Sequence, residues 1–241
     1  MEFYVNLGNF PIIGGSSKII GKTLTSDYLF VHYQHQRYLL SMKQKLKEFH
    51  RLSGIVIASF LLLHITNHLF ALGGPSLHIT VMKLFRHIYR FPPVEILLLI
   101  CVAFQIGSGI VLVFKKGFLK KPFYVIIQVL SGLYLSFFMI FHVWAVLTAR
   151  YKWKVETDFY FASGVAIRYP EKLFFIPYYT LSLVCIFAHI GCAHYLKRME
   201  HADTAVLKRK YKRETVAIGI AGAVITFLII TVFSGVFYPK Y

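Results

Sequence analysis

Residues 52–72 read LSGIVIASFLLLHITNHLFAL and contain no Asp, Glu, Lys or Arg. A helix that crosses the roughly 30 Å hydrocarbon core of a bilayer needs about 20 such residues, at about 1.5 Å of rise per residue. Similar apolar runs follow at 94–114, 123–148, 173–196 and 215–237. The sequence therefore predicts an all-α membrane protein with five transmembrane helices in a bundle.

The composition supports this class and argues against others. Of the 241 residues, 57% are apolar, against roughly 45–50% in soluble domains. The 27 Lys and Arg exceed the 10 Asp and Glu, which gives a formal net charge of +17. A nucleic-acid-binding protein would gather such cations on one exposed face. Here they fall in short clusters between the apolar runs, so we expect membrane lipid and no nucleic acid as a partner.

The distribution of basic residues predicts the orientation. Eighteen of the 27 lie in segments on the same side of the bilayer as the N-terminus, and nine lie on the other side. Because Lys and Arg are enriched on the inner side, we expect the N-terminus inside and the C-terminus outside. The chain is divided into an N-terminal inner-side segment, 1–50, and a five-helix transmembrane domain, 51–241. A short basic helix is expected from about residue 40.

Two connecting segments have patterns of their own. In 76–90, apolar residues recur every three or four positions and basic residues occupy another face. This predicts an amphipathic helix in the outer interface, between the first and second spans, with His78 and His87 facing solvent or headgroups. The loop 153–179 is rich in aromatic residues, which is typical of the belt at the bilayer surface. A lid over a cofactor is the alternative for this loop.

Histidines, and hardly any carboxylates, lie within the apolar runs. His64, His68, His142 and His189 fall inside predicted spans, where ionisable groups are costly and point to function. The scarcity of buried acids argues against proton-coupled transport. Imidazole is the usual axial ligand of heme b, and two imidazoles from different helices at one depth can hold one heme. Hydrogen bonding to a neighbouring helix is the other role open to these residues.

Depth along the helices selects candidate ligands. His68 lies four residues before the end of the first run, and His142 lies six before the end of the third, which crosses in the same direction. The difference of two residues is about 3 Å of rise, and His64 differs by two residues in the opposite sense. Depth therefore leaves open which of the two faces His142. His189 lies toward the inner side, where the second run offers Gln105 and no histidine, so one heme is expected in preference to two.

Residues 50–54 read HRLSG, where a basic segment meets the first apolar run. This resembles the His-Arg-x-Ser/Thr-Gly signature of the cytochrome b membrane-anchor subunits of the succinate dehydrogenase and fumarate reductase (complex II) superfamily. Five helices with histidines on the first, third and fourth are similar to its single-chain anchors. The resemblance implies a quinone site at Arg51 and Ser53. Two features depart from it: Lys47 stands where the family has a serine, and the second run lacks a heme-ligand histidine.

The resemblance implies a subunit that relays electrons from iron–sulfur and flavoprotein partners to quinone, in a bacterial or mitochondrial inner membrane. It would be a non-catalytic or quinone-site subunit of the oxidoreductase. Its cofactors would be heme b and quinone, with His68 and His142 as metal ligands and His64 and His189 as further candidates. Basic inner residues would face an acidic partner or anionic lipid; they are Arg51, Lys115, Lys116, Lys120 and Lys121. The alternative is a cofactor-free accessory or assembly membrane protein whose histidines only pack.

Overall fold

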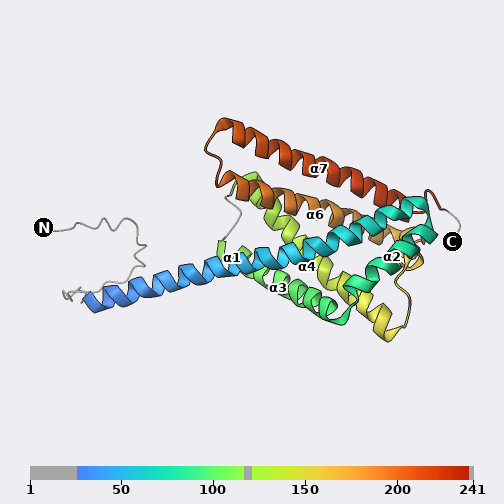
Figure 1. The fold of residues 1–241 in the computed structure, drawn as a ribbon, viewed down its shortest axis with the longest axis horizontal. Coiled ribbons are helices and arrows are strands. Elements are labelled where there is room, and N and C mark those ends of the chain that lie inside the picture. Colours follow the sequence, from blue (N-terminus) through green and yellow to red (C-terminus); the bar gives the residue numbers. More distant parts are fainter. Residues whose placement is uncertain (1–25, 117–120, 239–241) are drawn as a thin grey trace. The chain divides into compact units, whose positions relative to one another are not determined.

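The computed structural model describes residues 26–116 and 121–238, and it is helical with no strand in those ranges (Figure 1). Its helices, in chain order, are α1 Ser26–Leu69, a 3₁₀ turn η1 Phe70–Gly73, α2 Pro75–Tyr89, α3 Pro92–Lys116, α4 Phe123–Leu147, a π-helical turn η2 Thr148–Lys152, α5 Phe159–Ile167, α6 Lys172–Met199 and α7 Ala205–Phe233. Five of these helices, α1, α3, α4, α6 and α7, are long and apolar enough to cross a membrane. The predicted all-α class and number of spanning helices are confirmed, which makes the chain a multi-pass membrane protein.

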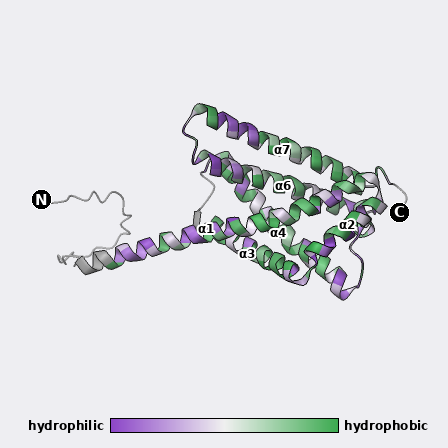
Figure 2. Ribbon diagram, in the orientation of Figure 1, coloured by the Kyte–Doolittle hydropathy of each residue, from purple (hydrophilic) through white to green (hydrophobic). Residues whose placement is uncertain are grey.

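Helix α1 belongs to two compact units of the chain, Met1–Gln44 and Lys45–Tyr241. The part of the first unit that the structure describes is a helix whose side chains from Val31 onward are mostly exposed and largely polar (Figure 2). The helix begins at Ser26, so the expectation that it starts near residue 40 is wrong. Polar sequence hid this start, because the segment has no apolar stripe to give a helical period.

In the second unit, α6 packs closely against both α4 and α7 (Figure 1). Small residues allow the close approach: Gly191 of α6 lies 3.6 Å from Ile218 of α7, measured from the position that a Cβ would take. Two tyrosine hydroxyls tie α4 to α6, since Tyr134 donates to the Tyr178 carbonyl at 2.9 Å and Tyr178 donates to the Phe138 carbonyl at 3.2 Å. In the described residues, α1 makes no comparably close backbone approach to α3, α4 or α6. The space between α1 and these three helices is a cavity.

Helix α2 forms where the pattern of 76–90 predicts a helix. Gly74, at φ 103°, provides the turn before it, and Pro75 occupies the first helical turn, where its missing N–H costs nothing. His87 is exposed as expected, but His78 is only 2% exposed, so its predicted solvent or headgroup position is wrong. His78 Nε2 accepts a hydrogen bond from Asn67 Nδ2 at 3.0 Å, and its ring packs against Phe159 and other rings.

The aromatic loop 153–179 contains a short helix, α5, which the apolar pattern of the sequence does not predict. Asp158 caps its N-terminus by accepting hydrogen bonds from the backbone N–H groups of Tyr160 and Phe161. Phe159, the first residue of α5, is 1% exposed and packs against Phe233 of α7. Phe159 is therefore a core residue. For this residue, neither the predicted belt at the bilayer surface nor the alternative lid over a cofactor is correct.

Candidate heme-binding cavity

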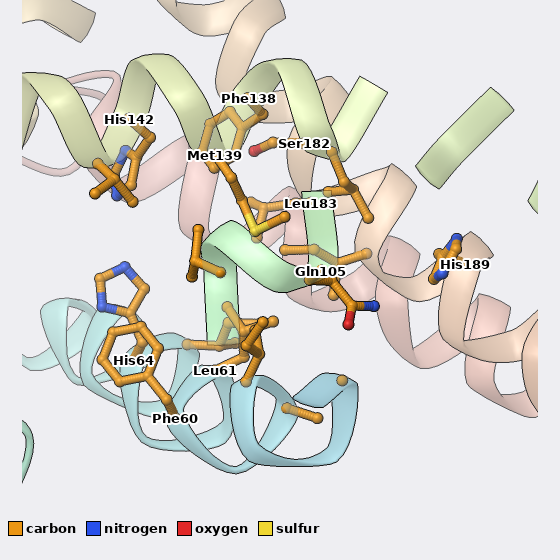
Figure 3. Close-up of a pocket in the computed structure, with 18 of the residues that line it drawn as sticks. Phe60, Leu61, His64, Gln105, Phe138, Met139, His142, Ser182, Leu183 and His189 are labelled. Atoms are coloured by element: carbon orange, nitrogen blue, oxygen red, sulfur yellow. The ribbon is translucent and has the colours of Figure 1, made fainter. Parts of the chain in front are cut away.

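A cavity of about 1010 Å³ runs through the second unit between α1, α3, α4 and α6. Apolar side chains line its middle, among them Leu61, Met139 and Leu183 (Figure 3). Histidines stand at both ends: His64 and His142 face each other at one end, and His189 lies with Gln105 at the other (Figure 3). Arg86, Arg90 and Arg150 also line the cavity.

The rings of His64 on α1 and His142 on α4 are 6.3 Å apart between centroids, at an interplanar angle of 73°. A metal–imidazole nitrogen bond is about 2 Å long, so two imidazoles on opposite sides of one ion hold their ligating nitrogens roughly 4 Å apart. Adding the distance from nitrogen to ring centre on each side gives a centroid separation close to the one observed; because Nε2 of His64 is bonded to Nε2 of His68, Nδ1 is the His64 nitrogen left for a metal. Phe60 stacks on His64 and Phe138 stacks on His142, which fixes both rings.

His68, the other candidate on α1, points elsewhere. Its ring stacks on His78 at 5.6 Å and meets Phe233 edge-on at 5.1 Å. Its Nε2 lies 3.2 Å from Nε2 of His64, which is a hydrogen bond between the two imidazoles. The structure therefore brings His64, and not His68, opposite His142, and places His68 behind His64.

The other end of the cavity holds a second group of polar residues around His50 and His189. His50 Nδ1 lies 2.7 Å from Ser108 Oγ, and His50 Nε2 lies 3.1 Å from Gln105 Nε2. His189 Nδ1 donates to the Gln128 carbonyl at 2.9 Å. Both imidazoles line the cavity and are close enough to interact electrostatically.

Two glycines make room for these rings. A Cβ at Gly132 would stand 3.0 Å from Cε1 of His189, and one at Gly109 would stand 3.5 Å from Cε1 of His50. The second span carries no histidine that could act as a partner for His189. The structure supplies His50, from the first helix, at that end of the cavity.

The predicted quinone residues lie at this same end. Ser53 is buried and donates one of two hydrogen bonds, to Gln105 Oε1 at 2.6 Å or to the His50 carbonyl at 3.0 Å. Arg51 lines the cavity with much of its side chain exposed. Lys121 is exposed, while the side chains of Lys115, Lys116 and Lys120 lie outside the described residues.

The opposite end carries three arginines. Arg86 donates to Glu156 at 2.8 Å and to Thr157, and Arg150 pairs with Glu95. Arg90 donates to Thr157 Oγ1 at 3.1 Å. Burial, followed by the neighbouring Arg86 and Arg150, lowers the pKa of Arg90. Burial also lowers the pKa of His78 to about 4, so this ring is neutral beside the cluster at physiological pH.

Within the described residues, no cluster of three or more His, Cys, Asp or Glu side chains is placed to hold a bare metal ion. A heme needs only two axial imidazoles, because its porphyrin provides the remaining ligands. Comparison with protein-family models, with curated protein sequences and with solved structures finds no match.

Proposed function

We propose that the protein is a heme-b-binding membrane subunit that relays electrons between a soluble iron–sulfur and flavoprotein partner and quinone, similar to the anchors of complex II. The observation that carries the proposal is the imidazole pair of His64 and His142 across an apolar cavity. Six-coordinate heme b supplies reversible storage of one electron. The proposed location is a bacterial or mitochondrial inner membrane, with the N-terminus inside and α2 in the outer interface.

The cavity fits a porphyrin in size and lining. Protein interiors are close-packed and contain few voids, so an opening of about 1010 Å³ within a helix bundle calls for an occupant. Small-molecule sites enclose about 300–1,000 Å³ and are mainly apolar with a few placed polar groups. The buried Nδ1 of His68 and Oδ1 of Asn67 have no hydrogen-bond partner, which further marks this end as a ligand site.

In this proposal His64 and His142 would hold the heme, in place of the predicted pair of His68 and His142. His68 acts as a positioning residue, because its hydrogen bond to His64 restrains the orientation of that ring. Partners of this kind, bonded to one nitrogen of a ligating imidazole, are the rule at metal sites.

In the same proposal His50 and His189 would hold a second heme. Each has Nδ1 held by another helix, through Ser108 Oγ and the Gln128 carbonyl. A hydrogen bond at Nδ1 directs the other imidazole nitrogen to a metal; His50 Nε2 is bonded to Gln105, so His50 would bind a heme only after the Gln105 side chain moves away. Fourteen residues separate His50 from His64, which places the two levels roughly 21 Å apart along the helix.

The quinone and partner assignments rest on the polar end around His50. Arg51 and Ser53 lie there, and a cation with hydrogen-bond donors suits the carbonyl oxygens of a quinone. The inner basic residues suit an acidic partner surface or anionic lipid. A cofactor-free accessory or assembly protein is the competing function, and it requires that the histidines only pack.

Spectroscopy of the purified protein separates these two functions. We expect a reduced-minus-oxidised spectrum with the sharp bands of six-coordinate heme b, and two hemes per chain by pyridine hemochrome assay. His64→Ala and His142→Ala should each remove one heme and leave the second, whereas His189→Ala should remove the other. The matched control is His87→Ala, since His87 is exposed and bonds only within α2.

The absence of heme from wild-type protein produced with adequate heme supply would refute the proposal. Retention of both hemes by His142→Ala would refute the ligand pair, and one heme in the wild type would refute the second site.

A further inference from the structure

The arginine cluster at the outer end of the cavity consists of Arg86 and Arg90, at the C-terminal end of α2, and Arg150 in η2. All three line the same cavity as His64 and His142. Guanidinium groups are costly in and near a bilayer unless they are paired. Three guanidinium groups at this position therefore need an anionic ligand, because otherwise their desolvation destabilises the fold.

Only two of the three have a carboxylate partner. Arg86 bonds Glu156, whose side chain is 75% exposed, and Arg150 bonds Glu95. Arg90 forms no ion pair within the described residues and bonds the hydroxyl of Thr157. The buried Nε of Arg86 also lacks a hydrogen-bond partner. Donors therefore remain at this end of the cavity that no group of the described chain satisfies.

The cluster lies within reach of the imidazole pair. Arg150 follows His142 by eight residues, about 12 Å along the axis, and helical side chains lean back toward the N-terminal end. On the other side, the Phe60 ring is 5.3 Å from the His64 ring and 5.3 Å from the ring of Tyr89, which neighbours Arg90. The middle of the cavity, by contrast, is apolar (Figure 3).

We propose that Arg86, Arg90 and Arg150 bind the propionate carboxylates of the heme held by His64 and His142. This inference rests on the proposed function. It fixes the orientation of the porphyrin, with its carboxylate edge toward the arginines and its apolar edge toward Leu61 and Met139. Arginine suits the role because its planar fork bonds a carboxylate through two N–H groups. An anion there also relieves the repulsion among the guanidiniums.

Heme and its dimethyl ester, which lacks the carboxylates, test the inference directly. Full-length apoprotein in nanodiscs of neutral lipid is titrated with each ligand. Wild type should bind heme at least about tenfold more tightly than the ester, since a hydrogen bond to a charged group is worth a tenfold change or more. Arg90→Gln should weaken heme binding by about tenfold and leave ester binding unchanged, and Arg90→Lys should fall between.

Ester binding by the same variant reports whether its cavity is intact, and Arg168→Gln, an exposed arginine that does not line the cavity, is the matched control. Equal wild-type affinity for the two ligands, or equal weakening of both by Arg90→Gln, would overturn this inference alone. Failure of wild type to bind either ligand would overturn the proposed function itself. If Arg90→Gln keeps full heme affinity but loses thermal stability only in anionic nanodiscs, the cluster binds lipid phosphate and the inference is wrong.

Discussion

Replacing Gly222 on α7 by alanine tests how tightly α6 and α7 are packed. A Cβ at this position would stand 2.8 Å from Cδ2 of Phe187 on α6 and closer still to Cβ and Cγ of the same residue. Carbon atoms pack at about 3.5–4.0 Å, so the contact requires a displacement of about 1 Å. The clashing atoms include Cβ of Phe187, whose position is fixed by the backbone, so a change of rotamer cannot remove the clash. Overpacking of this kind costs about 1–3 kcal/mol.

Gly219 is the matched control, since it lies one turn earlier on α7 and a Cβ there meets nothing within 4 Å. Both substitutions gain about 0.5–1 kcal/mol from the reduced flexibility of alanine, so their difference isolates the packing cost. We expect Gly222→Ala to have the lower free energy of unfolding by about 1–3 kcal/mol, measured by reversible SDS titration in mixed micelles. Equal stability of the two variants, or a more stable Gly222→Ala, would refute the packing described for α6 and α7.

Two further predictions concern the α5 cap and the second histidine pair. Asp158→Ala removes the cap of α5 and should lower the free energy of unfolding by about 0.5–2 kcal/mol, whereas Asp203→Ala, at an exposed site, should change it by less than about 0.5 kcal/mol; equal effects would contradict the capping role. Gly132→Ala pushes a Cβ to 3.0 Å from His189 and should reduce bound heme from two to one per chain, while Gly107→Ala, with nothing within 4 Å, should leave both; two hemes in the Gly132 variant would count against the second site.

The number of spanning helices was predictable because it depends on one-dimensional properties. Length and apolarity suffice to recognise a helix that crosses a bilayer, and each of the five predicted runs lies largely within a described helix. Two elements escaped this reasoning. The first part of α1 is largely polar, with side chains that are mostly exposed from Val31 onward, and α5 has only nine residues, so neither shows a sustained apolar period.

The candidate site was harder to predict because the geometry of the proposed ligands depends on angles and packing as well as depth. His64 and His68 differ from the depth of His142 equally, and packing against Phe233 decides that His68 turns away. His50 stood outside the predicted spans, which hid it as a candidate partner for His189. The spacing between His50 and His64 could have indicated this position. Fourteen residues are close to four helical turns, so both rings lie near one face of α1.

His50 and His64 are carried by a single uninterrupted helix. The distance between them along the helix axis is consequently fixed by backbone hydrogen bonds. It does not depend on how tightly the other helices pack around the cavity. Tilting or sliding of α1 would carry both rings together and preserve the interval between them. Inserting one residue between them would lengthen that interval by only about 1.5 Å, yet turn one ring by roughly 100° relative to the other. For this chain, angular register is therefore a stricter constraint than distance.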